Sequence, residues 1–320
     1  MEPFPAVSVI IPHLNEPEKL AECLRALDSQ RVDGIPFEVI VVDNGSRISP
    51  QAVCAAFEGV RLAREDTPGP GPARNHGVDL SRAAIIAFID ADCMAAEGWI
   101  AGIVGFFDAN PDIDVIGGDI KVAWSDPRRP NAVEAYESAY CYRNRLYVER
   151  HGYAATGNMA VRGDVFRAVG PFGGIGTMED TEWGQRATAQ GYRIAYAPDV
   201  CVVTPSCRSY AELVRRYDRH IAHEFGEWPS GPTAMAKWVA RAGVVAVSPL
   251  VEIVRLARLA GLPDWRARAL AWGVVARLRL YRAGRMLSIA LRNDANEVVG
   301  RWNRGDAPTG SNPVEMSRRT

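Results

Sequence analysis

The first half of the chain alternates short apolar runs with helical segments, and the clearest apolar runs end in polar or acidic turns. The predicted strands are Val7–Ile11, Phe37–Val42, roughly Val60–Ala63 and Ile85–Ile89, with a fifth candidate at Asp114–Ile116. The helices expected between them lie near Glu18–Ser29, Pro50–Phe57 and Ala73–Ser81. This alternation is typical of βαβ units and predicts an α/β fold, in which helices flank a Rossmann-type, mainly parallel sheet.

Three of these strands end in turns that carry polar groups, namely Pro12–Glu16, Asp43–Ser46 and Asp90–Asp92. Ligands of open α/β sheets bind outside the carboxyl ends of the strands, so we expect the three turns to converge on one crevice. The chain has no Gly-x-Gly-x-x-Gly motif after the first strand and no Gly-x-x-x-x-Gly-Lys-Ser/Thr motif. Their absence argues against a dinucleotide-dependent dehydrogenase and against a P-loop ATPase.

Asp90 and Asp92 lie one residue apart, directly after an apolar strand. Their oxygens are the ligands that suit Mg²⁺ or Mn²⁺ carrying a diphosphate. A solvated turn that caps the next helix is the simpler alternative. Asp43 closes the second strand, where a carboxylate can accept a hydrogen bond from a base or a ribose hydroxyl. Its alternative is an Asx turn, with Ser46 as a helix cap.

The charge of the chain is unevenly distributed, although the formal net charge of its 320 residues is only −1. Residues 237–304 contain thirteen basic and four acidic residues, so residues 1–236 carry a net charge of −10. Composition and length are those of a globular protein with two domains, or with one large domain and an appendage. The six cysteines show no Cys-x-x-Cys pair and no metal-like spacing, which predicts reduced thiols.

No basic segment precedes Val7–Ile11, so the N-terminus is not expected to be a signal peptide. The longest uncharged runs, Gly98–Phe107 and Ala242–Val251, have ten residues each. A spanning helix needs about 20. We therefore expect no conventional transmembrane segment. The expected location is the cytoplasm, either free or peripherally bound to the cytoplasmic face of the membrane.

Six motifs follow one another within residues 6–225. They are Val7-Ser-Val-Ile-Ile-Pro12 with Asn15-Glu16, Val41-Val-Asp-Asn-Gly-Ser46, Gly71-Pro-Ala-Arg-Asn-His-Gly77, Phe88-Ile-Asp-Ala-Asp92, Thr156-Gly-Asn-Met-Ala-Val-Arg162 and Glu179-Asp-Thr-Glu-Trp183. Together they resemble family 2 of the glycosyltransferases, which have the GT-A fold. The resemblance implies an inverting enzyme that moves a sugar from a nucleotide diphosphate donor, a UDP-sugar by preference, to an acceptor hydroxyl. It also implies that the enzyme acts in the synthesis of a cell-surface polysaccharide or a glycolipid.

The resemblance further implies roles for individual residues. Nucleotide and donor contacts fall on Pro12, Asn15, Glu16, Asp43, Arg74, Asp90 and Ala91. Asp92 is the implied ligand of Mn²⁺ or Mg²⁺, and Gly157 and Asn158 are the implied wall of the sugar and acceptor pocket. Asp180, preceded by Glu179, matches the general base. Physical chemistry agrees, because an acceptor hydroxyl needs a carboxylate within about 3 Å to take its proton.

Several of these residues have simpler interpretations. Glu179 and Asp180 also fit an acidic first helical turn, where negative charge is favourable. Trp183 is either a core residue or a platform on which an acceptor sugar stacks. His220 and His223 share one face of a helix predicted over Arg208–Glu224, and they either complete the metal sphere or lie on a solvated face. No Gln-x-x-Arg-Trp motif follows, which argues against processive polymerisation.

The chain is predicted to divide into a catalytic domain (1–228), a helical, Arg-rich region (229–304) and a flexible tail (305–320). Arginines of the second region interleave with apolar residues and with Trp265 and Trp272. This pattern suits helices on an anionic membrane, where a lipid-linked acceptor would be reached. The alternative is packing on the catalytic domain or on a second subunit. The acidic body and the lack of a binding motif argue against nucleic acid as a partner.

Two other functions stay open at this level. One is a catalytically silent relative that serves as a scaffold, although the presence of Asp43, Asp90, Asp92 and Asp180 argues against it. The other is a sugar nucleotidyltransferase of the same fold. The lack of a Gly-rich loop with Arg and Lys after the first strand argues against that function.

Overall fold

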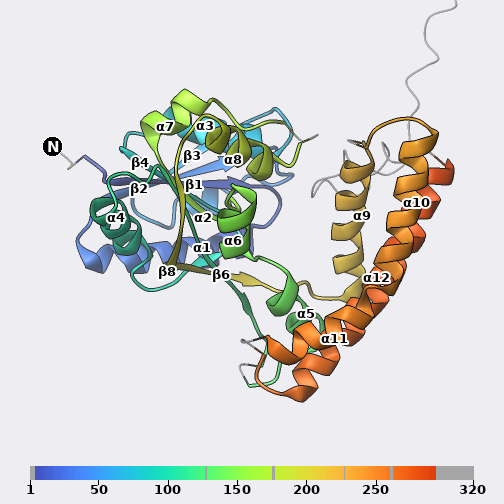
Figure 1. Ribbon diagram of the computed structural model, residues 1–320. Coiled ribbons are helices and arrows are strands. Elements are labelled where there is room, and N and C mark those ends of the chain that lie inside the picture. Colours follow the sequence, from blue (N-terminus) through green and yellow to red (C-terminus); the bar gives the residue numbers. More distant parts are fainter. Residues whose placement is uncertain (1–3, 127, 175–176, 227, 260–261, 293–320) are drawn as a thin grey trace, which may run out of the picture.

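The computed structural model describes residues 4–126, 128–174, 177–226, 228–259 and 262–292. Within them an eight-stranded sheet forms the body, in the order β3-β2-β1-β4-β7-β6-β8-β5 (Figure 1). The strands are β1 (Val7–His13), β2 (Phe37–Asp43), β3 (Val60–Arg64), β4 (Ile85–Ile89), β5 (Met94–Ala95), β6 (Val115–Ala123), β7 (Asn158–Arg162) and β8 (Ile194–Pro205). All five predicted strands are confirmed, each with its start shifted by at most one residue.

The sheet is mixed, and the change of direction at β7 shapes the site. The pairs β1–β2, β1–β4, β2–β3 and β6–β8 are parallel, whereas β4–β7, β6–β7 and β5–β8 are antiparallel. Because β7 runs against β4, Asn158 at the start of β7 pairs with Ile89 at the end of β4. The segment that precedes β7 therefore lies beside the turn that follows β4.

The two faces of the sheet are covered by different helices, as the period of two in a strand requires. Val9 and Ile11 of β1 belong to a core formed with α1 (Pro17–Asp28) and α4 (Trp99–Ala109). Ile10, between them, belongs to a second core formed with α3 (Pro70–Leu80), α7 (Gly163–Val169) and α8 (Glu179–Ala189). Apolar residues on both faces of β1 make it a central, fully buried strand.

The predicted helices are confirmed with changed ends. The helix expected over Pro50–Phe57 is limited to α2 (Gln51–Cys54), and the helix expected from Ala73 begins earlier, at Pro70. Proline at the first helical position needs no backbone N–H, so the segment rich in proline and glycine opens α3 instead of preceding it. A Cβ on Gly71 would lie 2.1 Å from the Gly173 carbonyl oxygen, so only glycine permits this contact.

A second layer beside the sheet (Figure 1) is formed by α5 (Ala132–Tyr140), α9 (Tyr210–Gly226), α10 (Pro232–Val247), α11 (Pro249–Arg258) and α12 (Trp265–Arg292). The short α6 (Asn144–Leu146) and a π-helical turn (Tyr147–His151) contact β6 and β8 of the sheet instead. One core joins α5 to α9, α11 and α12, and another joins α9 to α10 and α12. Packing of the basic region on the rest of the chain is therefore observed.

Ion pairs within this layer use many of the arginines that the sequence singled out. Arg279 lies 3.4 Å from Glu252, and Arg282 lies 2.8 Å from Glu224. Helix α9 falls inside the predicted catalytic domain but packs against α10 and α12, and the boundary at residue 228 stays a prediction. The predicted tail, 305–320, lies outside the described residues. Across the part of the chain that the structure describes, every helix is too short or too polar to cross a membrane.

Candidate active site

A cavity of about 330 Å³ lies at the carboxyl ends of β1 and β4. Its walls come from the turns after β1 and β4, the start of α3, the segment before β7 and the first turn of α8. The lining residues are Pro12, Leu14, Glu16, Pro70, Arg74, Asp90, Ala91, Asp92, Cys93, Ile120, Tyr142, Ala155, Thr156, Gly157, Glu179, Asp180 and Thr204. Two of the three predicted turns meet here, and the turn after β2 does not line this cavity.

Asp90 follows β4 and faces the backbone that leads into β7. A Cβ on Gly157 would lie 3.0 Å from Oδ2 of Asp90, a contact tighter than side chains normally make. Glycine at this position lets the chain pass close to the carboxylate. The antiparallel pairing of β4 with β7 thus brings Gly157 and Asp90, 67 positions apart, to one wall of the cavity.

Arg74 of α3 is buried and joins two carboxylates that lie far apart in the sequence. Its Nη2 donates to Oδ1 of Asp90 at 2.6 Å, and its Nη1 donates to Oε1 of Glu179 at 2.9 Å. Burial opposes the positive charge, but the two carboxylates raise the pKa of Arg74. The guanidinium therefore stays charged between α3, the end of β4 and the start of α8.

A second pair of hydrogen bonds holds the segment before α8 against α3. The Asn75 side chain donates to the Phe172 carbonyl at 3.0 Å and accepts from the Phe172 N–H at 2.9 Å. Asn75 and Arg74 are neighbours in α3, so α3 bonds both to Phe172 and to Glu179 at the start of α8.

Asp92 and Asp90 form the acidic end of the cavity. Burial, and then the negative charge of Asp90, raises the pKa of Asp92 to about 6. Lys19 offsets part of that charge, since its Nζ lies 3.7 Å from Asp92 and 2.8 Å from Glu16. The charge that remains between the two aspartates favours a bound cation.

The donor atoms present fit a hard divalent cation. Ligand atoms of Asp90, Asp92 and Cys93 all lie within 4.8 Å of one another. Burial raises the pKa of the Cys93 thiol well above its usual value, so the sulfur keeps its proton and is a poor ligand. Two carboxylates remain, and Mg²⁺ and Mn²⁺ bind through few carboxylates together with substrate oxygens. Asp90 and Asp92 are the residues that would hold the ion.

Asp180 lies in the first turn of α8 and also lines this cavity. Burial, and then the adjacent charge of Glu179, raises its pKa to about 6. Hydrogen bonds from the backbone N–H of Thr181 at 2.7 Å and from its hydroxyl at 3.2 Å oppose this rise. A carboxylate with a pKa near 6 is a better proton acceptor than an ordinary aspartate and is still ionised at neutral pH.

A second cavity, of about 520 Å³, meets the first at Tyr142, Ala155 and Asp180. Its walls are rich in tyrosine and come from the π-helical turn, α9 and α12. The other lining residues are Tyr140, Cys141, Tyr147, Tyr153, Met178, Thr181, Arg216, Tyr217, His220, Glu224 and Arg282. The rings of Tyr147 and Tyr153 stack with centroids 5.0 Å apart. Asp180 therefore lies where an acidic cavity joins an aromatic one.

Two predicted pocket residues are structural instead. Trp183 is fully buried, stacks on Phe166 and donates from Nε1 to the Gly170 carbonyl, so it cannot stack on an acceptor sugar. Asn158 is buried as well. Its amide donates to the carbonyls of Asp119 in β6 and Val200 in β8, and it accepts from the indole of Trp99. Asn158 of β7 therefore links three strands. Of the two interpretations of Trp183, the structure supports the core residue, and the Asn158 side chain is not among those that line the first cavity.

Three other predicted residues, Asp43, Asn15 and His220, do not line the first cavity. Asp43 is buried and accepts from the Ser46 backbone, and Asn15 joins the same loop by accepting from the Arg47 N–H. Their roles in nucleotide binding stay predictions. His220 lines the second cavity and is not among the grouped metal-binding side chains of the described residues. The side chain of His223 lies outside the described residues.

Sequence reasoning missed several lining residues that carry no charge. Tyr142, Ile120 and Thr204 come from the α5–α6 connection, from β6 and from β8, which no site motif includes. Tyr142 has a left-handed backbone with φ of 51°, which is rare for a residue other than glycine. A signal for the tyrosine-rich cavity was present in the repeated tyrosines of residues 136–153, but nothing in their spacing assigns them to one wall.

A model of the family described as "Glycosyl transferase family 2" matches residues 8–170. The chain belongs to this family. The glycosyltransferase is 34% identical over 222 residues to glycosyltransferase AglE of Haloferax volcanii, covering 68% of this chain and 72% of that protein. It is also 34% identical over 108 residues to the uncharacterized glycosyltransferase Rv0539 of Mycobacterium tuberculosis, covering 34% of this chain and 46% of that protein. A transferase is thus favoured over the scaffold and the nucleotidyltransferase.

Solved structures share the fold of this glycosyltransferase. The mannosyltransferase PcManGT from Pyrobaculum calidifontis, in complex with GDP-Man and Mn²⁺, matches with a TM-score of 0.55 and 18% identity, over 90% of this chain and 88% of that one. S. aureus TarS 1–349, in complex with UDP-GlcNAc, matches with a TM-score of 0.51 and 16% identity, over 91% and 89% of the two chains. The GT-A fold predicted from the sequence is confirmed.

Proposed function

We propose that this glycosyltransferase transfers a sugar from a nucleotide diphosphate donor in the first cavity to an acceptor hydroxyl that enters from the second. The observation that carries the proposal is the position of Asp180 at the junction of the two cavities. A general base for this reaction must contact the acceptor while the donor lies on its other side.

The donor half rests on the charged groups at the end of β4. Asp90 and Asp92 would hold a divalent cation, which would supply electrostatic stabilisation of the charge that grows on the leaving diphosphate. Arg74 provides a fixed positive charge beside it, anchored by Asp90 and Glu179. The presence of Mn²⁺ in the PcManGT complex supports a divalent ion. The two structural neighbours are complexes with GDP-Man and UDP-GlcNAc, so the UDP-sugar predicted from the sequence needs a direct test.

The acceptor half rests on the aromatic cavity. Tyrosine rings offer flat apolar faces to a sugar ring and hydroxyls to its polar rim. His220 and Arg282 add polar groups at the same cavity. A saccharide, free or carried on a lipid, fits this chemistry. With a lipid carrier, the enzyme works at the surface of a membrane.

The chemical step is a single displacement. The Asp180 carboxylate takes the proton of the acceptor hydroxyl while the hydroxyl oxygen forms its bond to the anomeric carbon. The bond from that carbon to the diphosphate breaks, and the diphosphate leaves with the electron pair. One displacement inverts the anomeric configuration, whereas a covalent intermediate would retain it. Because Asp180 must be ionised, the rate should fall as the pH drops below about 6.

The test begins with donor binding. Titration of the protein with a panel of nucleoside diphosphates by calorimetry, with and without Mn²⁺, should identify one nucleotide whose binding depends on the metal. Release of that nucleotide from its sugar conjugates, measured above and below about pH 6, then tests transfer. Folded protein that binds none of the nucleotides contradicts the proposal.

A further inference from the structure

Helices α10 and α11 present an exposed apolar face to solvent. The exposed fraction is 65% for Val244, 62% for Val247, 68% for Leu250 and 74% for Val251. We define the α10–α11 apolar face by its large exposed residues, which are Val239, Val244, Val247, Leu250, Val251, Ile253 and Val254. Figure 1 shows α10 at the edge of the molecule farthest from the sheet.

This face is separate from the side on which the same helices pack. Trp238, Ala242, Val245 and Leu256 are buried against neighbouring helices. Val244, Val247, Leu250, Val251 and Val254 recur at the helical spacing of three and four on the opposite side, and Ser248, between the two helices, keeps a right-handed helical backbone. The helix pair is therefore apolar on two sides, and only one side is covered.

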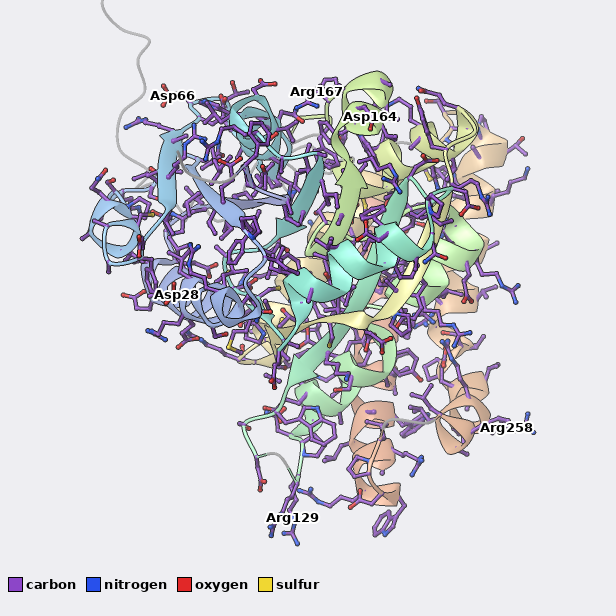
Figure 2. All side chains as sticks on the ribbon, turned by 90° about the vertical axis from the view of Figure 1, so that its left-hand side faces the viewer. Asp28, Asp66, Arg129, Asp164, Arg167 and Arg258 are labelled. Carbon is purple, nitrogen blue, oxygen red and sulfur yellow. The ribbon has the colours of Figure 1, made fainter. Side chains whose placement is uncertain are left out.

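The charges around the face are basic. Between Pro232 and Arg258 the sequence has a single acidic residue, Glu252, which is buried and accepts from the Tyr140 hydroxyl. Lys237, Arg255 and Arg258 are exposed in the same stretch. Figure 2 shows Arg258 pointing away from the body of the protein at the end of α11. A surface cavity of about 450 Å³ lies between apolar and basic side chains, namely Val251, Val254, Arg255, Arg258 and Leu259.

We propose that the α10–α11 apolar face docks on an anionic lipid bilayer, with α10 and α11 lying in the plane of the headgroups. Contiguous apolar surface of this kind is uncommon on soluble monomers and marks an interaction site. Helices that lie in the interface place apolar residues among the acyl chains and basic residues at the lipid phosphates. Trp265, which is 80% exposed at the start of α12, adds an aromatic residue suited to that boundary.

Charge favours a bilayer over a second copy of the chain. In a symmetric antiparallel pairing of two such faces, the Lys237 end of one copy meets the Arg255 and Arg258 end of the other. Like charges then approach each other, which disfavours the pairing. Lipid phosphates carry the opposite charge. The inference does not depend on the donor, acceptor or metal proposed above. It deepens the proposed function, because docking on a bilayer would bring the enzyme to a lipid-linked acceptor.

The test is flotation of the full-length protein with vesicles of phosphatidylcholine, with and without phosphatidylglycerol. We expect binding to the anionic vesicles that weakens with added salt and is lower on phosphatidylcholine alone. The variant Val247→Asp/Val251→Asp should lose at least about tenfold in affinity, because it puts two charges into the buried side of the contact. Arg258→Glu should weaken binding by about tenfold or more, since it replaces an attraction with a repulsion.

The matched control is Ile48→Asp, a substitution of the same kind at a side chain that is 80% exposed on the loop after β2. It should bind vesicles as the wild type does. Nucleoside diphosphate binding and thermal melting establish that each variant is folded. The inference is overturned if folded wild type ignores anionic vesicles, or if Val247→Asp/Val251→Asp binds them unchanged. It is also overturned if light scattering finds a wild-type dimer that this variant converts to a monomer while vesicles bind neither.

Discussion

The carboxyl end of β4 and the α10–α11 apolar face each contain groups whose surroundings are unfavourable for folding, but for different reasons. At the first, charged groups are withdrawn from water and held by one another, as Arg74 is by Asp90 and Glu179. At the second, apolar side chains such as Val251 stay in water. Buried charge and exposed apolar surface are both unfavourable, so each needs a reason outside the fold. The comparison teaches that the two regions are suited to different ligands, an ionic one and a lipid in the proposals above, and substitutions can test that difference.

The largest effect should come from Asp180→Asn. Because asparagine cannot take a proton, the transfer rate should fall by about 10²- to 10⁴-fold, while nucleotide affinity stays within a factor of two or so. Initial rates and calorimetry measure the two quantities. Glu182→Gln is the control on the same helix, since Glu182 lines neither cavity and pairs with Arg186. Equal rates for Asp180→Asn and wild type would remove Asp180 as the base.

Removal of the buried guanidinium should have a large effect on folding. Arg74→Gln leaves Asp90 and Glu179 without their shared partner, so the free energy of unfolding should fall by about 3 kcal/mol. Urea denaturation measures it. Arg64→Gln is the control, because Arg64 pairs with Asp66 at the surface, where an ion pair contributes about 0–1 kcal/mol. Similar losses in the two variants would show that the ion pairs around Arg74 are energetically ordinary.

Asp180→Asn should also stabilise the fold, in a way that depends on pH. The pKa of Asp180 is about 6 in the folded protein and 3.8 ordinarily, so its ionisation costs stability as the pH rises through 6. The variant should therefore exceed the wild type by about 1–3 kcal/mol at pH 8, and the difference should vanish near pH 3. Urea denaturation at several pH values measures this. A difference that is constant with pH would argue against the raised pKa.

A smaller effect is expected on the metal-dependent part of nucleotide binding. Asp92→Ala should weaken nucleoside diphosphate binding in Mn²⁺ by about tenfold or more, with little change in EDTA. Cys93→Ala should leave the Mn²⁺ dependence intact, since its protonated thiol is not a ligand. Calorimetry in the two buffers measures both. A loss of Mn²⁺ dependence in Cys93→Ala would place the sulfur on the metal.

The smallest effect should be on folding at the α10–α11 apolar face. Val251→Asp should change the free energy of unfolding by less than about 0.5 kcal/mol, because that side chain is already in water. Trp238→Ala, on the covered side of α10, should cost about 3–5 kcal/mol. Thermal melts without lipid compare the two. A large loss in Val251→Asp would mean that the face is covered within the protein.

Much of the site at the carboxyl end of β4 could be predicted from the sequence, because its signals come from consecutive residues. Apolar runs followed by acidic turns place Asp90 and Asp92 at a strand end, and the order of the motifs indicates the family. The motifs leave open the direction of side chains that depends on packing. Trp183 and Asn158 stand in motifs beside site residues, yet one points into the core and the other bridges strands. A motif establishes proximity along the chain, whereas orientation depends on the neighbours in space.

The sequence by itself determined the α/β order, the family and the acidic residues at the strand ends, because strand period, turn chemistry and motif order are properties of consecutive residues. Only the tertiary structure decided that Arg74 bridges Asp90 and Glu179, that two cavities meet at Asp180, and that one side of α10 and α11 lacks cover. These features need residues far apart in the chain to come together. Apolar periodicity marks the sides of a helix that can be buried, but only packing decides which of them is covered.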